Sequence, residues 1–460
     1  MREKIVEILK KAVWGGIVLT LFLRCIIEFW LLRFIDINDF VQIRLIEGRA
    51  NHIIESIIFF TFFLFVIQRF LEKKSFQFDL SLDGSLLGFI SLSLISFAYT
   101  INIQTSLQAF QELISLTFLF YMVSIIALNK RIYKDFICLL VIIAVGISLY
   151  GIRQYYVIFP FLESSGMLDN VTGIGKSMVT LRRVSSVFGW PNKLAGFLGI
   201  CIPVAIGMIL AHFSVVKSKA EVNHVSKTAK HTLLLRLLLF IASFILFLCM
   251  FFTYSIGGWL SLLFALIIEG ILIVTIIGKK NIKELFFSKK ILSGVVSTSI
   301  IIIFICLIGI TFQKRMGAVT ASATSARISY IKGTLIVIKD NPILGAGIGN
   351  FKTAYGRYVP SGKDATKHAH NSYLELWADI GIAGLLLFLL FTFQLLRRGV
   401  HIINDIKDRE DKLLITSLFS GVCVFLIHNI MEFTFYVHSV ALYWWFIAGL
   451  LTSRIRMKNN

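Results

Sequence analysis

Two histidines and an asparagine stand together where a long polar stretch meets an apolar run: His368, His370 and Asn371. An imidazole has an ordinary pKa of about 6.5, so it is largely neutral at neutral pH and can take a proton from a hydroxyl group. We therefore interpret His370 as a candidate general base. His368 and His370 could instead share a metal ion, but neither a thiol nor a carboxylate adjoins them to complete a ligand set. A third interpretation, an inert pair of loop histidines, is left open by the spacing alone.

The polar stretch that leads to His370 is strongly basic. Residues 313–375 hold nine lysines and arginines against three acidic residues. The planar guanidinium of arginine binds phosphate oxygens through two parallel hydrogen bonds, so Arg315 and Arg327 are candidates for an anionic substrate. Arg182 and Arg183, which close a second polar stretch at 158–190, could form the far wall of the same site. Solvated surface charges and anchors for lipid headgroups are the plainer alternatives.

Local patterns subdivide the stretch 313–375. Apolar residues at 328, 331, 335 and 338 have helical spacing, which predicts an interfacial helix over 327–339 with Arg327 in its first turn. The helix should end before Pro342, because proline disfavours a helical residue in front of it. Gly345, Gly347 and Gly349 then predict a tight turn, with a backbone cradle for phosphate as the alternative.

The elements that position these residues are apolar helices. The chain has 460 residues, of which 57% are hydrophobic, 16% are charged and only 5 are proline. Its apolar residues fall in blocks of roughly 20, the length of a membrane span. These features predict an all-α integral membrane protein of about twelve transmembrane helices, with a large exoplasmic loop that carries short interfacial helices. We expect the spans near 12–32, 53–71, 80–100, 107–128, 136–157, 190–212, 233–253, 256–278, 291–312, 376–396, 413–431 and 433–452.

Basic residues predict the orientation of these spans. With a cytoplasmic N-terminus, the inner segments hold 27 lysines and arginines and the outer segments hold 17, as the positive-inside rule requires. Both termini should be cytoplasmic, and the loops 158–190 and 313–375 should be exoplasmic. The chain then divides into spans one to nine (1–312), the catalytic loop (313–375), and the last three spans with a cytoplasmic tail (376–460).

The charge of +20 is explained by this topology, so we expect no nucleic acid as a partner. All six cysteines fall inside apolar blocks, which predicts packing thiols and neither disulfides nor a zinc cluster. The tail residues Arg454, Arg456 and Lys458 should contact anionic lipid headgroups.

The run that begins at His370 resembles the signature of the O-antigen ligase/polymerase superfamily of bacterial membrane glycosyltransferases. That signature is met by His370, Asn371, Gly381 and Gly384. Three further segments are similar to the family: Arg327 with 341–351, Arg183 to Asn192, and His428 to Glu432. One position departs, since the family often has an arginine where this chain has Ile256.

The resemblance implies transfer of a glycan from an undecaprenyl diphosphate carrier to an acceptor hydroxyl, at the outer face of the bacterial cytoplasmic membrane. His370 would act as the base of an inverting displacement. Arg327 and Arg183 would bind the diphosphate, with Arg182 or Arg315 replacing the basic group absent at Ile256, and Asn371 would join the substrate-binding set. No cofactor, nucleotide or metal is expected.

The acceptor is lipid A core if the chain is a ligase, which we favour, and another carrier-linked repeat if it is a polymerase. A protein acceptor is a further alternative. A transporter or flippase for lipid-linked sugars is the rival from another class. It would require charged residues along the middle of the bundle, where Glu112, Arg236 and Glu269 are few and scattered.

Overall fold

The computed structural model describes residues 2–34, 40–76, 78–166, 173–220, 226–277, 317–359 and 366–458. Throughout these ranges the regular elements are helices, as an all-α membrane protein requires. The long ones are α1 (Arg2–Phe34), α2 (Phe40–Glu72), α3 (Leu82–Ile95), α4 (Ile103–Ile126), α5 (Lys130–Arg153), α8 (Pro191–Ala220), α9 (Ser226–Phe252), α10 (Ile256–Ile277), α13 (Gly317–Asp340), α15 (Ser372–Asp405), α16 (Arg409–His428) and α17 (His438–Lys458). The shorter ones are α6 (Phe159–Ser164), α7 (Gly173–Thr180), α14 (Phe351–Tyr355), a π-helical turn (Gln154–Ile158) and three 3-10 turns (Ser96–Tyr99, Ser186–Phe188 and Thr434–Tyr436).

Nine helices within the described residues are long and apolar enough to cross a membrane. Eleven of the twelve expected spans coincide with described helices, and the remaining one, 291–312, lies outside the described residues. The helices α1 and α17 are not among the nine, so the total of twelve stays a prediction.

The C-terminal helix α17 forms part of the core of the bundle. It packs against α4 and α16, and its residues Tyr443, Trp444 and Trp445 are fully buried. Three adjacent aromatic residues without exposure show that all sides of this helix are covered by other helices.

Burial of α17 extends to its arginines, and this corrects the expected role of the tail. Arg456 donates to Asp83 at 2.7 Å, while the Arg454 guanidinium lies 4.1 Å from the centre of the Tyr133 ring and donates to a backbone carbonyl. Both side chains are buried, so the prediction that they meet lipid headgroups is wrong. The side chain of Lys458 lies outside the described residues.

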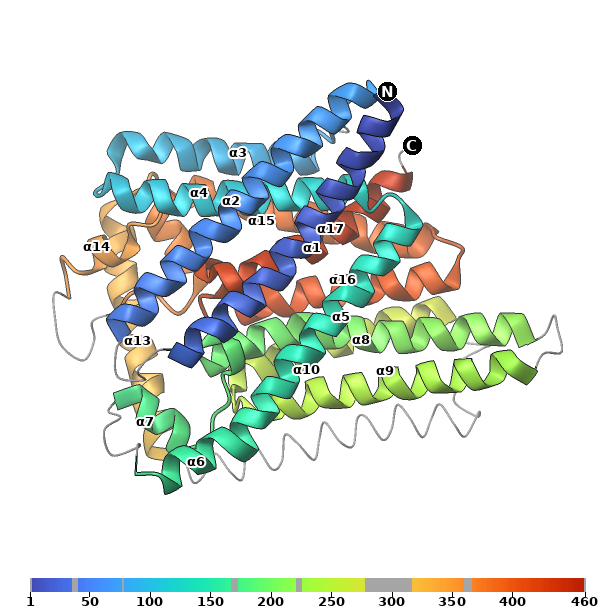
Figure 1. Ribbon diagram of the computed structural model, residues 1–460. Coiled ribbons are helices and arrows are strands. Elements are labelled where there is room, and N and C mark those ends of the chain that lie inside the picture. Colours follow the sequence, from blue (N-terminus) through green and yellow to red (C-terminus); the bar gives the residue numbers. More distant parts are fainter. Residues whose placement is uncertain are drawn as a thin grey trace.

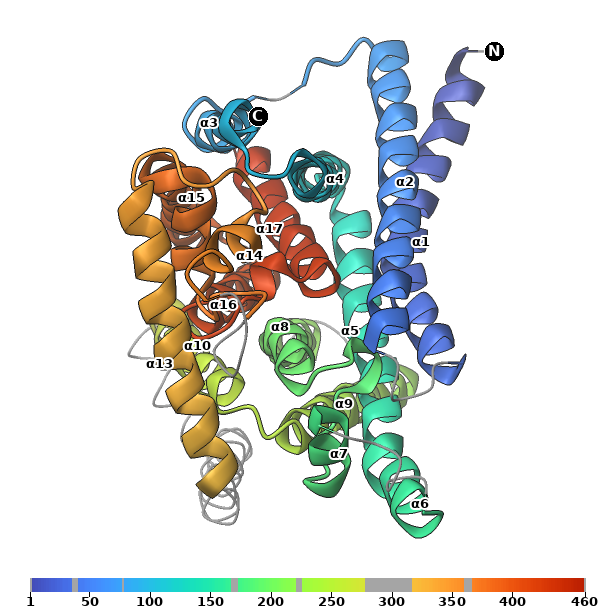
Figure 2. The same cartoon turned by 90° about the vertical axis from the view of Figure 1, so that its left-hand side faces the viewer.

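Helix α13 runs across the ends of the long helices (Figures 1 and 2). It shares this end of the bundle with α6, α7 and α14, whereas both chain termini lie toward the other end (Figure 1). The two polar loops therefore meet at one end, as the topology predicted. Two details differ, because α13 has 24 residues and is not short, and because it begins at Gly317. Arg327 consequently lies in its middle and not in its first turn.

A kink in α15 lets the loop after α13 pack against it. Gly381 has φ +72°, a conformation that side chains rarely adopt, and a Cβ placed there would lie 1.8 Å from the carbonyl oxygen of Ile343. On the loop side, a Cβ at Gly345 would lie 2.5 Å from the backbone of Asp379. Both glycines are needed for the same close backbone contact.

Candidate active site

A single carboxylate, Glu432, lies at the centre of the residues that the sequence singled out. It follows α16 and is buried. Its Oε1 accepts hydrogen bonds from Arg327 Nη2 and, at 2.6 Å, from Asn192 Nδ2. Its Oε2 lies 3.6 Å from His370 Nδ1, which is an ion-pair distance but too long for a hydrogen bond. The two oxygens thus face different groups: Oε1 faces Arg327 and Asn192, and Oε2 faces the imidazole of His370.

Arg183 reaches the same carboxylate through Asn192. Its Nη2 donates to Asn192 Oδ1 at 3.2 Å, and its Nε donates to the carbonyl of Thr253 at the same distance. Asn192 stands at the start of α8, so the asparagine joins a loop arginine to Glu432 across the end of the bundle. Burial lowers the pKa of Arg183, but an arginine remains protonated at physiological pH.

Helix α13 supplies two residues to the site from one face. Arg327 and Tyr330 are three residues apart, so their side chains point the same way. The Tyr330 ring stacks on the imidazole of His370, with the ring centres 5.4 Å apart and 22° between the planes. Phe433 meets the same imidazole edge-on at 4.8 Å. Two aromatic rings therefore fix the orientation of the His370 imidazole ring.

The backbone at His370 is itself held in an unusual conformation. Its φ of +52° is uncommon for a residue with a side chain, and such residues concentrate at functional sites. The next element starts at once: Asn371 caps α15, and its Oδ1 accepts from the backbone N–H of Tyr373 and Leu374, each at 3.0 Å. The structure thus gives the oxygen of Asn371 a structural role, and its substrate-binding role stays a prediction.

The start of α15 is also tied to the segment that carries Glu432. The backbone N–H of Ser372 donates to the carbonyls of Asn429 at 2.9 Å and Glu432 at 3.1 Å, and its hydroxyl donates to Asn429 Oδ1. Because Ser372 is two residues from His370, these bonds fix His370 relative to Glu432. Such supporting contacts commonly decide whether a site is accurately positioned.

The electrostatics of Glu432 reflect its neighbours. Burial alone would raise its pKa, but His370, Arg327 and His428 outweigh burial, so the pKa lies below the ordinary glutamate value. The carboxylate is therefore charged at neutral pH.

His428 is fully buried at the end of α16 and lies in a space left by two glycines. A Cβ at Gly196 would lie 3.1 Å from His428 Nδ1, and a Cβ at Gly257 would lie 3.7 Å from its Cδ2.

His368 has different partners from those of His370. Its Nδ1 lies 2.8 Å from Glu375 Oε1, and the other oxygen of Glu375 accepts the Ala369 N–H at 2.9 Å. The ring stacks on Phe433 at 4.2 Å. The sequence had suggested that no carboxylate neighbours the two histidines. In the fold each faces a carboxylate, but a different one, which disfavours a metal shared between them.

In and beside the glycine-rich turn, the backbone N–H groups of Gly347, Gly349 and Phe351 are already hydrogen-bonded, so they are not free to bind a phosphate. Asp379 accepts the N–H of Gly349 at 3.1 Å and of Phe351 at 2.7 Å through its carboxylate, and its backbone oxygen accepts that of Gly347 at 2.8 Å. The tight turn is therefore confirmed, and the alternative of a phosphate cradle is wrong.

One predicted arginine does not join the cluster. Arg182 points to Glu163, with Nη2 to Oε2 at 2.9 Å, and this hydrogen bond raises its pKa. Arg315 lies outside the described residues. Of the predicted set, the structure brings together His370, Arg327 and Arg183.

Three members of the cluster were not predicted as site residues: Glu432, Asn192 and Tyr330. The first two lie in segments noted only for their family resemblance. A signal for both was present, because each is a polar residue at the end of an apolar span, close to a second polar residue. Tyr330 could have been found as the residue one turn after Arg327.

The sequence was then compared with known proteins. A family model described as O-Antigen ligase, Wzy_C, matches residues 241–389. This part of the chain belongs to the O-antigen ligase/polymerase superfamily. The curated proteins include no match to the chain.

The O-antigen ligase match contains Arg327, Tyr330 and His370, but it does not contain the rest of the cluster. Arg183 and Asn192 precede it, and Glu432 follows it. The fold thus brings residues of the matched segment together with residues that lie before and after it in the chain.

Proposed function

We propose that the chain is an O-antigen ligase-like glycosyltransferase, which moves a glycan from undecaprenyl diphosphate to an acceptor hydroxyl. The family match carries the coarser statement, an O-antigen ligase or polymerase type of function. The observation that supports the finer one is the convergence of His370, Arg327 and Arg183 around Glu432.

In this proposal His370 is the base. Its Nδ1 faces Glu432, which leaves Nε2 to accept the proton of the acceptor hydroxyl. The acceptor oxygen then attacks the anomeric carbon while the bond from that carbon to the diphosphate oxygen breaks. The leaving undecaprenyl diphosphate takes the electron pair, and the configuration at the anomeric carbon inverts. Glu432 stabilises the imidazolium that forms.

Arg327 and Arg183 act on the leaving group. Arg327 contacts the Glu432 carboxylate directly and Arg183 is joined to it through Asn192. Two guanidinium groups against one carboxylate charge leave an excess positive charge, so the cluster can accept the charge that develops on a diphosphate. Their fixed positions, set by α13 and by Asn192, avoid reorganisation during the reaction. Residues 313–375 thus act as the catalytic loop, without metal or nucleotide in the proposed step.

The proposal places this end of the bundle at the outer face of the cytoplasmic membrane and both termini inside. The preferred acceptor is lipid A core. A transporter would use ionisable residues along the bundle. Of the candidates, Glu112 hydrogen-bonds with Asn51 and Arg236 stacks on Phe213, whereas the ionisable residues of the cluster meet at one end.

The test uses the purified full-length protein with an undecaprenyl diphosphate-linked glycan and two acceptors offered separately. A glycan joined to lipid A core supports a ligase. Longer carrier-linked chains, with lipid A core left unmodified, would make the protein a polymerase. Movement of the donor across a vesicle membrane without any transfer would overturn the enzyme proposal.

A further inference from the structure

A polar cavity lies far from the Glu432 cluster. Helix α15 starts beside His370, and Arg397 lies 25 residues after Ser372, about 37 Å along the helix at 1.5 Å per residue. That distance exceeds the roughly 30 Å of a bilayer's hydrocarbon core. The cavity is therefore at the other end of the bundle, where α15 leaves the membrane.

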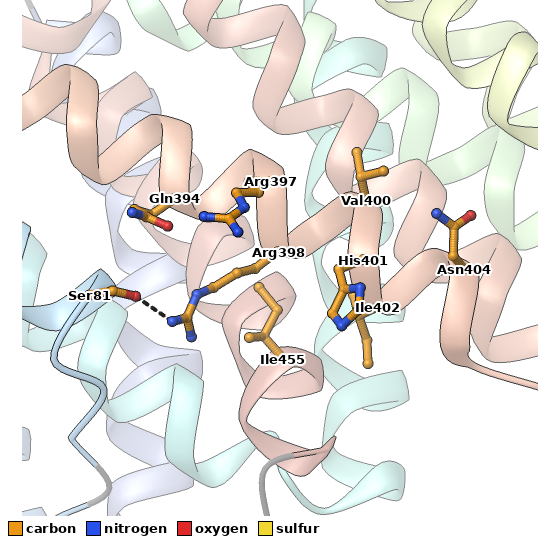
Figure 3. A pocket seen from close by; sticks show the side chains of 9 residues that line it. All are labelled: Ser81, Gln394, Arg397, Arg398, Val400, His401, Ile402, Asn404 and Ile455. Atoms are coloured by element: carbon orange, nitrogen blue, oxygen red, sulfur yellow. Dashed lines mark hydrogen bonds between the residues drawn. The ribbon is translucent and has the colours of Figure 1, made fainter.

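This cavity has a volume of about 570 Å³ and lies between α15, the start of α3 and the end of α17. Figure 3 shows Arg397 and Arg398 side by side at its centre, with His401 one turn further along α15. The complete lining consists of Ser81, Gln394, Arg397, Arg398, Val400, His401, Ile402, Asn404 and Ile455. The polar groups of this lining are guanidinium, imidazole, amide and hydroxyl groups, which suit an anion, and a carboxylate is not among them.

The nearby carboxylates fix the cationic groups from outside the cavity. Asp79 pairs with Arg398, whose other nitrogen donates to Ser81. Asp405 pairs with His401 at 3.2 Å. Within the described part of the chain, no ion pair includes Arg397, whose side chain is exposed. Arg397 is thus the cation that remains available, with Arg398 held in place beside it.

Exposed apolar side chains occur in or next to the lining segments. Leu80, next to Ser81, is 81% exposed, and Phe393, one turn before Arg397, is 59% exposed. Val400, which belongs to the lining, and Met457, two residues after Ile455, are also exposed. An exposed apolar surface beside a cationic pocket suits a ligand that has acyl chains next to its phosphate, and a free phosphate ion would not use it.

We propose that this cavity binds the phosphate headgroup of an anionic phospholipid, with Arg397 as the main contact and the exposed apolar residues against its acyl chains. This site is separate from the Glu432 cluster and does not depend on the proposed function. It also provides the headgroup contact that the buried Arg454 and Arg456 cannot make.

The test compares lipid retention by the full-length protein in native mass spectrometry. The protein in detergent is given phosphatidylglycerol or phosphatidylcholine, and inorganic phosphate is added in a separate arm. We expect wild type to retain phosphatidylglycerol in preference, and Arg397→Ala to weaken that retention about fivefold, the usual effect of one basic residue near an anionic headgroup. Arg397→Ala removes an exposed side chain, so the protein should fold.

The matched control is Lys407→Ala, which removes an exposed positive charge just after α15 but outside the lining. It should leave retention unchanged. An equal loss of phosphatidylglycerol retention in both variants would mean that general surface charge binds the lipid, and it would overturn the proposed site. Competition by inorganic phosphate at millimolar concentration would overturn a lipid ligand, and equal retention of phosphatidylcholine would overturn the preference for an anionic one.

Discussion

His370 and Glu432 face each other between the start of α15 and the segment that follows α16, with Nδ1 3.6 Å from Oε2. In the proposed mechanism this pairing gives the two ring nitrogens different tasks, because Nδ1 faces the carboxylate and Nε2 would accept the proton of the acceptor hydroxyl. The hydrogen bonds of Ser372 to Asn429 and Glu432 keep the two residues in this relation.

The first prediction concerns the base. His370→Ala should lower turnover about 10²–10⁴-fold, the usual contribution of a general base, while donor lipid still binds. His368→Ala is the control. The His368 ring pairs with Glu375 and not with Glu432, so its removal should lower turnover much less. Turnover and donor binding are measured on both variants. Equal loss of turnover in both would assign the two histidines a shared structural role.

The second prediction separates charge from shape at Arg327. Lysine keeps the charge but loses the planar fork, so Arg327→Lys should fail almost as completely as Arg327→Ala in donor binding and transfer rate. Lys352→Ala, at an exposed position of α14, is the control and should behave like wild type. A fully active Arg327→Ala would remove this arginine from the diphosphate site.

The third prediction concerns stability and pH. The fold lowers the pKa of the Glu432 carboxyl below its ordinary value of 4.5. The charged carboxylate therefore stabilises the folded protein fully at pH values above 4.5. This stabilisation is lost as the pH falls through the lower pKa of the folded state. Glu432→Gln should therefore destabilise the protein at pH 7, by about 1.5–3 kcal/mol for hydrogen bonds to a charged group. Thermal unfolding in detergent should show this difference shrink only below pH 4.5. A difference that is constant down to pH 3 would mean that the charge contributes nothing.

The fourth prediction tests the kink in α15. Gly381→Ala forces a side chain into a positive φ and against the Ile343 carbonyl, so it should cost at least about 1–3 kcal/mol of stability and reduce transfer. Gly146→Ala is the matched control, because a Cβ there has no atom within 4 Å in the described structure. If the two variants unfold at the same temperature, the kink is not a constraint.

The fifth prediction concerns orientation. Single cysteines at Thr353 and Lys407, in a chain that lacks its native cysteines, should react differently with an impermeant reagent applied to spheroplasts. Both positions are exposed and lie at opposite ends of the bundle. We expect labelling only at Thr353. Labelling only at Lys407 would place the Glu432 cluster inside the cell.

The sequence alone predicts most of the helices and part of the candidate site. Apolar blocks of membrane-spanning length predict spans directly, because a bilayer leaves few other solutions for the backbone. Arg327 and His370 were found because their chemistry is unusual beside such blocks. The contacts between distant segments were not predictable in this way. Glu432 meets Asn192 across 240 positions of sequence, and only the packing of α8 against α16 brings them together.

The tail shows why composition alone can mislead. Arg454 and Arg456 look like an exposed basic end, yet α17 lies within the bundle and their guanidinium groups contact Tyr133 and Asp83. Burial of an arginine depends on a partner from another helix, and that partner cannot be read from neighbouring positions. Arg397, at the same end of the bundle, is by contrast exposed.

The position of Arg327 and Tyr330 on one turn of α13 has a consequence for how mutations combine. The first residue contacts Glu432 and the second stacks on His370, so a tilt or slide of this one helix changes the surroundings of the carboxylate and of the imidazole at the same time. Rate losses from substitutions along α13 should therefore not add, because each single change already disturbs what its neighbour supports. Kinetic analysis of the proposed transfer should treat Arg327 and Tyr330 of α13 as one unit.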